Sequence, residues 1–463
     1  MKRIAFFCIP AHGHTNPMLP VAAELASRGH AVRFYSFAQF EKKIAATGAE
    51  FVSCDRFLTE LTEKEQSGLN AVSSTELAVQ DIRITLALDG FLEEEFKRFR
   101  PDVVYSDSVC FWGKLNAWKH KVPLVVSTST FAFNQISSHY MKNSPGELAD
   151  MIFGLPRISK ELKKLEPHGY RVKNALSLIQ SDNSTDSVVY TSRRFQPYAE
   201  SFSDHYAFVG PSFFSDAGPD KAHRKLVYIS MGTVINDKLE FYKNCIEALK
   251  DEDADVIISC GNAVDPRSLG ALPEKIKVYP YVDQLDILSR ANAFITHCGM
   301  NSVSESLYMA TPMVLYPQTG EQKAVARRAA ELKAGVMLSD DSPEGIRRAV
   351  REVLNSAEYA SAAGECSADL RSCPGAVGAA DFIENAPHSS NGVDIVKELN
   401  KGTARFRLLY WAVAAIIIVL VGCFFGWKYC WIVGAAAGVL SYPISNIFGK
   451  AWYKRLLKKH GVI

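Results

Sequence analysis

Apolar and polar residues alternate along the chain in blocks that predict strands and helices in turn. The apolar run KRIAFFCIP, residues 2–10, predicts a buried strand, and NPMLPVAAELASRGH, residues 16–30, has the spacing of a helix that ends near a glycine. AVRFYSF, residues 31–37, predicts a second strand. The same alternation continues through residues 101–107, 111–121, 122–130 and 187–192. We therefore expect an α/β fold, with a mainly parallel sheet in the N-terminal half.

The alternation stops in one polar stretch and then starts again. Residues 211–225, PSFFSDAGPDKAHRK, are rich in Pro, Gly, Ser and Asp, which is typical of a linker. We therefore expect an N-terminal Rossmann-like domain over residues 1–212, a linker over 213–224 and a C-terminal Rossmann-like domain over 225–385. Ligands of such sheets lie at the carboxyl ends of the strands, here in the cleft between the two domains.

The last part of the chain has a different pattern, without the polar face of a surface helix. Residues 408–427 are twenty residues without a charge, enough for a helix to cross about 30 Å of hydrocarbon. Residues 430–449 are also uncharged, although Pro443 interrupts them. A helix buried in a protein core is the alternative for the first segment. We predict a polar and basic linker over 386–407, a transmembrane helical hairpin over 408–449 and a basic cytoplasmic tail over 450–463.

Charge indicates how this hairpin is oriented. The chain has 463 residues, 22% of them charged, and nine of its 52 basic residues lie within residues 401–463, which hold no acidic residue. Basic clusters flank the two apolar segments, with only Lys428 between them, so the positive-inside rule places both ends in the cytoplasm. We expect a membrane-anchored protein whose domains face the cytoplasm and which contacts membrane lipid through residues 408–449 and the basic tail. A solvated tail beside a purely structural anchor is the alternative.

Two further features favour the cytoplasm. The ten cysteines include no C-x-x-C pair and lie among apolar neighbours, which is typical of reduced, buried thiols. The N-terminal apolar run is shorter than that of a signal peptide and leads into Pro, His and Asn, so we interpret it as a first strand.

The stretch FITHCGMNSVSES, residues 294–306, joins the end of a strand to the start of a helix through small polar residues. Unpaired N–H groups and the positive end of the helix dipole suit a phosphate there. His297 can donate to the same anion, and Glu305 can accept from vicinal hydroxyls such as those of a ribose. Helix capping alone, by Asn301, Ser302 and Ser304, is the alternative.

A second strand end has similar residues. YISMGTV, residues 228–234, runs into Ser, Gly and Thr, whose backbone N–H groups could hold another phosphate. The sequence contains no G-x-x-x-x-G-K-[ST], and its first βα turn lacks G-x-G-x-x-G. An anion is therefore held by neither a P-loop nor a dinucleotide-binding turn.

Taken together, these motifs point to a known family. Residues 281–322, YVDQLDILSRANAFITHCGMNSVSESLYMATPMVLYPQTGEQ, resemble the nucleotide-sugar signature of the family-1 UDP-dependent glycosyltransferases, especially their bacterial, macrolide-transferase-like branch. IPAHGHTNPMLPVAAELASRGHAV, TSRRFQP and HYAFVGPSF resemble further parts of that family in the same order, so the resemblance covers about residues 3–385. It implies a GT-B fold, with the acceptor bound mainly by the N-terminal domain and the nucleotide sugar mainly by the C-terminal one.

The resemblance also implies which residues bind the donor. Tyr281 would lie against the uracil ring and Gln284 would help define the base, while Glu305 would contact the ribose. His297 and Ser302 would contact the diphosphate, with Ser230 and Thr233 nearby, and Glu321 and Gln322 would contact the sugar hydroxyls; Val282, Gly299 and Asn301 complete the implied donor set. The family usually has Trp at the place of Tyr281 and Pro at the place of Asp283, which here gives less stacking area and an extra charge beside the base.

The catalytic groups follow from the same resemblance. Of His12 and His14, His14 is the implied general base, because Pro17 follows it by the family spacing, and His12 would shape the loop after the first strand. Asp107, six residues after Pro101, would hold His14 in its useful tautomer, although it could instead cap the next helix. Direct displacement would invert the anomeric carbon. No metal and no cofactor besides the UDP-sugar co-substrate is expected, because helix N-termini and His297 would neutralise the leaving diphosphate.

The expected activity is transfer of a hexose, most simply glucose, from UDP to a hydroxyl of a lipophilic small molecule or lipid, with no nucleic acid as partner. The membrane hairpin motivates the lipophilic acceptor. Acceptor specificity is expected from residues 55–100 and 131–180, which we interpret as long irregular stretches. A nucleotide-sugar epimerase or hydrolase of the same fold and a non-catalytic, membrane-anchored binding protein are the alternatives.

Overall fold

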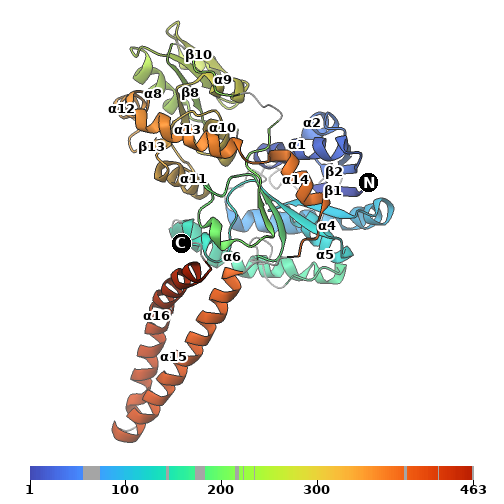
Figure 1. Cartoon of the computed structure of the whole chain (residues 1–463), viewed down its shortest axis with the longest axis vertical. Coiled ribbons are helices and arrows are strands. Elements are labelled where there is room, and N and C mark those ends of the chain that lie inside the picture. The colour runs from blue at the N-terminus through green and yellow to red at the C-terminus, as the bar shows by residue number, and fades with distance from the viewer. Residues whose placement is uncertain are drawn as a thin grey trace.

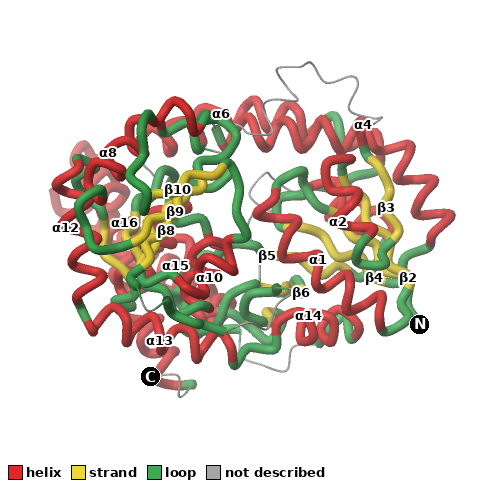
Figure 2. Tube along the Cα trace, turned by 90° about the horizontal axis from the view of Figure 1, so that it is seen from above, coloured by secondary structure: helices red, strands yellow, loops and turns green. Residues whose placement is uncertain are grey.

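The structure is a computed structural model with two α/β domains side by side and a pair of long helices that projects from them (Figure 1). Seen along that pair, the strands of each sheet are enclosed by helices (Figure 2). The residues that the structure describes are 1–55, 73–141, 145–172, 183–213, 218–222, 224–233, 235–389, 394–425 and 427–460.

The N-terminal domain is built on a seven-stranded, all-parallel sheet in the order β3-β2-β1-β4-β5-β6-β7. Its interior strand β1 is fully buried over residues 4–7, because helices cover both faces of a parallel sheet. The strands are β1 Arg3–Phe7, β2 Ala31–Ser36, β3 Glu50–Ser53, β4 Val103–Asp107, β5 Leu124–Thr128, β6 Asp186–Val189 and β7 Tyr206–Phe208. The helices are α1 His12–Ser27, α2 Glu41–Ala45, α4 Ser74–Phe99, α5 Phe111–His120 and α6 Pro145–Lys163. The predicted first strand and parallel sheet are confirmed.

The C-terminal domain repeats this architecture with six parallel strands in the order β10-β9-β8-β11-β12-β13. The strands are β8 Leu226–Ser230, β9 Asp255–Ser259, β10 Ile276–Tyr279, β11 Ala293–Thr296, β12 Met313–Leu315 and β13 Gly335–Met337. The helices are α8 Leu239–Leu249, α9 Gln284–Arg290, α10 Met300–Tyr308, α11 Gly320–Glu331, α12 Pro343–Asn355 and α13 Ala357–Arg371. Ser230 pairs with Thr296 at the carboxyl ends of β8 and β11, so the two polar motifs after these strands meet.

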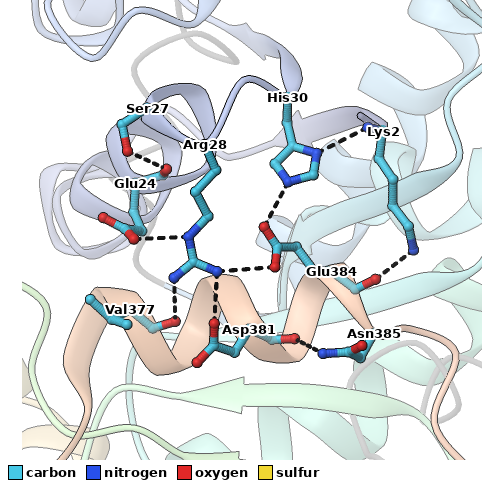
Figure 3. Close-up of polar contacts among 9 residues, drawn as sticks. All are labelled: Lys2, Glu24, Ser27, Arg28, His30, Val377, Asp381, Glu384 and Asn385. Atoms are coloured by element: carbon cyan, nitrogen blue, oxygen red, sulfur yellow. Dashed lines mark hydrogen bonds and ion pairs between the residues drawn. The ribbon is translucent and has the colours of Figure 1, made fainter.

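Helix α14, Gly375–Glu384, crosses back from the C-terminal domain to the N-terminal one. Its buried residues Ala379, Ala380 and Ile383 belong to the core that α1 forms with the first sheet. Figure 3 shows the polar side of this contact, in which Arg28 pairs with Asp381 at 2.7 Å and with Glu384 at 3.0 Å. The domain boundaries stay predictions, but this end of the expected C-terminal domain packs on the N-terminal domain, because its apolar face fits there.

The expected linker over residues 386–407 is helical from Ile395 onward. It forms the first part of α15, Ile395–Phe425, which turns back into α16, Cys430–Lys459. The rings of Phe406 and Phe448 stack between the two helices with centroids 4.0 Å apart. The base of the pair contacts the N-terminal domain, where the hydroxyl of Tyr453 donates to Glu200 at 2.7 Å.

The two regions expected to be irregular contain long helices. Residues 74–99 form α4 and residues 145–163 form α6, which pack on each other. Their mixed sequence is that of helices with one half-buried face, which lacks the apolar continuity used to recognise the strands. The rest of those regions includes residues 56–72, 142–144 and 173–182, which lie outside the described residues.

Candidate active site

The segment after β1 carries His14 into the cleft from the first turn of a helix. Ala11 has an extended backbone and α1 begins at His12, so the loop expected here is already helical. Pro17 has no N–H, which leaves the carbonyl of Gly13, four residues earlier, without its helical partner. That carbonyl accepts from Nδ2 of Asn301 at 3.0 Å, across the cleft from the start of α10. Asn301 thus joins the expected donor motif to the expected base.

His14 and Asp107 form the predicted pair. Nδ1 of His14 lies 2.8 Å from Oδ2 of Asp107, which is fully buried at the end of β4, while the His14 side chain is 27% exposed. The hydroxyl of Ser129, just after β5, is 3.1 Å from the same nitrogen. With Nδ1 donating to the carboxylate, the other ring nitrogen keeps its lone pair and can accept a proton. Asp107 also accepts from the backbone N–H of Val109, at 3.0 Å, as a cap would.

Electrostatics keeps His14 close to the useful range. Burial by itself would lower the pKa of His14, but the charge of Asp107 and the hydrogen bond to it outweigh this, so the pKa is raised from its ordinary value. His12 differs: its side chain is exposed and its ring meets Phe40 edge-on at 5.0 Å. Partial desolvation of the ring, followed by the charge of Lys43, lowers the pKa of His12. The two histidines therefore have different surroundings, and His14 alone has a carboxylate partner.

On the opposite side, a group of polar residues lines the C-terminal domain between α9 and α10. Nε2 of Gln284 donates to Oγ of Ser302 at 3.2 Å and also to the carboxylate of Glu305, while Oε1 of Gln284 accepts from the hydroxyl of Tyr228 at 3.1 Å. Burial raises the pKa of Glu305 to about 7, and Gln284 only partly opposes this. The predicted base-binding and ribose-binding residues thus hold one another.

His297 lies between two glycines at the ends of β8 and β11. A Cβ on Gly232 would come within 2.5 Å of the His297 ring, and one on Gly299 within 2.6 Å. Gly232 also has a φ of +77°, which favours glycine for a second reason. Burial lowers the pKa of His297 to about 4, so at neutral pH the ring can offer an N–H but not a positive charge. Nδ1 of His297 is buried and has no hydrogen-bond partner among the described residues.

The remaining expected base-binding and phosphate-binding residues differ in exposure. Tyr281 is 79% exposed, with its ring face available for stacking, while Val282 packs against the core of the domain. Ser230 is buried at the end of β8, and Thr233 beyond it is exposed. Asp283, the departure from the usual Pro, accepts from the N–H of Asp286 and so caps α9. The structure gives this departure a local role.

Glu321 and Gln322 lie in the first turn of α11. Oε1 of Glu321 accepts from the hydroxyl of Thr130 in the N-terminal domain at 2.7 Å. Oε1 of Gln322 accepts from the N–H groups of Gln318 and Thr319, at 2.8 and 3.2 Å, in a capping box with Thr319. Gln322 thus has a structural task besides the expected contact with sugar hydroxyls, for which its amide NH₂ can still turn to a ligand.

Sequence reasoning missed Ser129 and Thr130, which follow β5. They place one hydroxyl on His14 and the next on Glu321, and so connect the two halves of the site. Their position at the carboxyl end of a strand was the available signal. The cleft between the domains holds a cavity of about 30 Å³ lined by Asn16, Pro17, Tyr190, Pro211, Ser212, Phe213, Asn301, Ser304 and Glu305.

Comparison with known proteins agrees with this geometry. Residues 218–368 match the family model described as UDP-glucoronosyl and UDP-glucosyl transferase. An uncharacterized UDP-glucosyltransferase of Bacillus subtilis, YojK, is 32% identical over 399 residues, covering 83% of this chain and 98% of that protein. The chain belongs to the UDP-glycosyltransferase family. It is thus an enzyme that transfers a sugar from a nucleotide to an acceptor.

Other members support the expected branch. The NDP-glycosyltransferase YjiC of Bacillus licheniformis is 33% identical, covering 83% of this chain and 97% of that protein, and the demethyllactenocin mycarosyltransferase of Streptomyces fradiae is 30% identical, covering 83% and 86%. The crystal structure of the kitacinnamycin glycosyltransferase superposes with a TM-score of 0.71 at 25% identity, covering 83% of this chain and 98% of that one. The GT-B fold and the resemblance to the bacterial macrolide branch are confirmed.

Proposed function

We propose that this glycosyltransferase is an inverting enzyme that moves a hexose, most simply glucose, from UDP to a hydroxyl of a lipophilic small molecule or lipid. The observation that carries the proposal is the pairing of His14 with buried Asp107 at 2.8 Å, beside the Gly13 carbonyl that Asn301 contacts across the cleft. A base so close to the start of α10 would meet an acceptor hydroxyl next to the donor.

The chemistry follows from the position of these groups. The free ring nitrogen of His14 takes the proton of the acceptor hydroxyl as that oxygen attacks the anomeric carbon, and Asp107 stabilises the imidazolium that forms. Attack from the side opposite the leaving diphosphate inverts the configuration. The N–H groups at the start of α10 and the neutral ring of His297 donate to the departing diphosphate.

The donor residues have separate tasks in this proposal. Tyr281 stacks on uracil beside Val282, and Gln284 reads the base edge; Glu305 binds the ribose hydroxyls. Ser230, Thr233, Gly299, Asn301 and Ser302 surround the diphosphate, and Glu321 with Gln322 contacts the sugar. Since Gln284 and Glu305 hold each other in the free protein, donor binding must exchange their mutual hydrogen bond for bonds to the nucleoside.

The lipophilic acceptor and the location are proposed from the C-terminal helices. Ile395–Val421 and Cys430–Lys459 are long and apolar enough to cross a membrane, with mean hydropathies of 2.0 and 1.4, and each is 6% buried over its most apolar window. We place both ends and both domains in the cytoplasm because basic residues flank the pair. Protease digestion of the domains from outside sealed, right-side-out membrane vesicles would contradict this orientation.

Mass spectrometry tests the transfer itself. Membranes carrying the full chain are incubated with UDP-glucose and a panel of hydroxylated lipids and aglycones, and hexose adducts are sought. His14→Ala should reduce adduct formation by about 10²- to 10⁴-fold, since it removes the general base. His12→Ala is the matched control and should keep the activity. UDP release without any adduct would favour the hydrolase alternative, and neither product with several sugar donors would favour a binding protein.

A further inference from the structure

A buried lysine lies behind the His14–Asp107 pair, and the mechanism above does not use it. Lys114 is in the first turns of α5 and is 4% exposed. Its ammonium group donates to the carbonyl of Ser108, the residue that follows Asp107. Removing an ammonium group from water is costly unless charges and hydrogen bonds compensate it. A lysine is therefore a demanding choice for this position, where an apolar residue would pack without that cost.

The turn that Lys114 contacts is the one that holds Asp107 in place. Within it the N–H of Cys110 donates to the carbonyl of Asp107 at 3.1 Å, and the hydroxyl of Ser106 donates to the carbonyl of Cys110 at 3.2 Å. The ammonium of Lys114 ties the middle of this turn to α5. Because Asp107 orients the His14 ring, any movement of the turn moves the base.

A second acidic group completes the surroundings of the lysine. Asp81, on α4, is 7% exposed, and burial raises its pKa while the charge of Lys114 opposes the rise. Burial lowers the pKa of Lys114 to about 8, against the charges of Asp107 and Asp81. Among the described residues, the titratable groups that interact here are Cys8 just after β1, His14 of α1, Asp81 of α4, Asp107 of β4, Cys110 in the turn, Lys114 of α5 and, across the cleft, Glu321 of α11.

We propose that Lys114 is a positioning residue for the reaction, which anchors the turn that carries Asp107 and, together with Asp81, balances the charge behind the His14–Asp107 pair. The inference rests on the proposed role of His14 as the base. Lys114 would have two separable effects. Its hydrogen bond to Ser108 fixes the geometry of the turn. Its positive charge should oppose the imidazolium form of His14 by like-charge repulsion, whereas the charge of Asp81 favours that form.

Lys114→Met tests both effects in the full-length protein in its membrane. We expect kcat to fall by about 10- to 100-fold, as a small misplacement of a catalytic group does, while KM for UDP-glucose changes less than about twofold. The acidic limb of the pH profile of kcat/KM should move to higher pH, since the imidazolium loses a repelling charge. Lys114→Arg keeps the charge and a hydrogen-bond donor. It should retain most of the native kcat, and its acidic limb should lie at the native pH.

Lys119→Met is the matched control. It removes a charge from the same helix, but from its far end, where Nζ of Lys119 pairs with Oδ1 of Asp89 at 2.8 Å. The acidic limb of the pH profile should therefore stay unchanged. Melting temperatures of all variants separate loss of folding from loss of catalysis. If Lys114→Met and Lys119→Met lowered kcat equally, without a shift of the limb, the inference would be wrong.

Asp81→Asn keeps the test decisive if Lys114→Met folds poorly. Alone it should move the acidic limb to lower pH, opposite to Lys114→Met, because it removes a charge that stabilises the imidazolium. The double variant removes both buried charges together, so it should fold better than either single variant. The acidic limb of its pH profile should return toward that of the native enzyme, while kcat stays low because the hydrogen bond to Ser108 is missing. If the acidic limb of kcat/KM moved in the same direction in both single variants, the claim that Lys114 and Asp81 act oppositely on His14 would be wrong. Activity that survives His14→Ala would instead contradict the proposed function.

Discussion

The two sides of the cleft prepare their functional groups in different ways. On the N-terminal side, His14 is bound to Asp107, which itself accepts from the N–H of Val109, so the proposed base already has its partners in the absence of substrate. On the C-terminal side, Gln284 and Glu305 bond to each other, and the ring of Tyr281 is 79% exposed. One side is organised by contacts that are already made, whereas on the other side, under the proposed function, donor binding would exchange the existing partners.

This difference follows from what each side has to recognise. A general base needs one fixed geometry whichever acceptor enters, so a buried carboxylate suits it. A nucleotide sugar presents many polar groups, and empty protein groups that await it would be left unpaired unless they satisfied one another. We therefore expect changes on the N-terminal side to act mainly on kcat, and changes on the C-terminal side to act mainly on donor binding.

Asp107→Asn should have the largest effect among the substitutions that probe this contrast. It keeps the shape of the side chain but removes the charge that stabilises the imidazolium, so kcat should fall by about 10²-fold or more. Because Asp107 raises the pKa of His14, the acidic limb of kcat/KM should move to lower pH in the variant.

Steady-state kinetics between pH 5 and pH 9 would measure both effects of Asp107→Asn, and the affinity for UDP-glucose should stay within about twofold of the native value, by calorimetry. A loss of donor affinity as large as the loss in kcat would mean that the two sides of the cleft are not independent.

The contrast also explains what the sequence could predict of the site. His14, Asp107, His297 and Glu305 stand in motifs whose spacing is local, so the family resemblance could assign them. The contact between Asn301 and Gly13 joins residues that are 288 positions apart, and it depends on a carbonyl freed by Pro17. No local sequence pattern predicts a contact over that separation, so it becomes visible only in the folded structure.

Gly232→Ala should have the next largest effect, on the donor side. The new methyl group would come within 2.5 Å of the His297 ring, and the φ of +77° is unfavourable for alanine. We expect the dissociation constant of UDP-glucose to rise by about tenfold or more, with a lower melting temperature. Gly29→Ala is a control for the backbone conformation alone, because the φ of Gly29 is +83° and an added Cβ would meet nothing within 4 Å. If both substitutions raised the dissociation constant of UDP-glucose equally, the contact with His297 would not be the cause.

The pH dependence of donor binding should be smaller. Glu305 has a pKa raised to about 7, so it is largely protonated at pH 6 and ionised at pH 8. Only the carboxylate can accept from both ribose hydroxyls, so affinity for UDP-glucose should rise with pH, by up to about tenfold between pH 6 and pH 8. Calorimetry at several pH values measures this, and Glu305→Gln should bind more weakly and without the slope. A slope that persisted in Glu305→Gln would assign the titration to another group.

The elements were predicted with uneven success for physical reasons. Strands such as β1 and β11 are continuous apolar runs, which buried parallel strands require, and they were found. Helix α4 was taken for an irregular stretch because its apolar residues cover only one face. Helix α14 carries no sign in its sequence that it crosses to the other domain, since its buried alanines would suit either core.

Tyr281→Trp should have the smallest effect, and in the opposite direction. Tyr281 is 79% exposed, so a larger ring fits without displacing a neighbour, and it offers more area for stacking on uracil. We expect the dissociation constant of UDP to fall by about two- to threefold, which corresponds to about 0.5 kcal/mol of added stacking. Asp283→Ala separates the other departure from the family pattern: it removes the cap of α9 and should lower the melting temperature without that gain in affinity. If Tyr281→Trp changed kcat and left UDP binding unaltered, position 281 would act on the transfer step. The proposed division, in which the C-terminal side acts mainly on donor binding, would then be wrong for this residue.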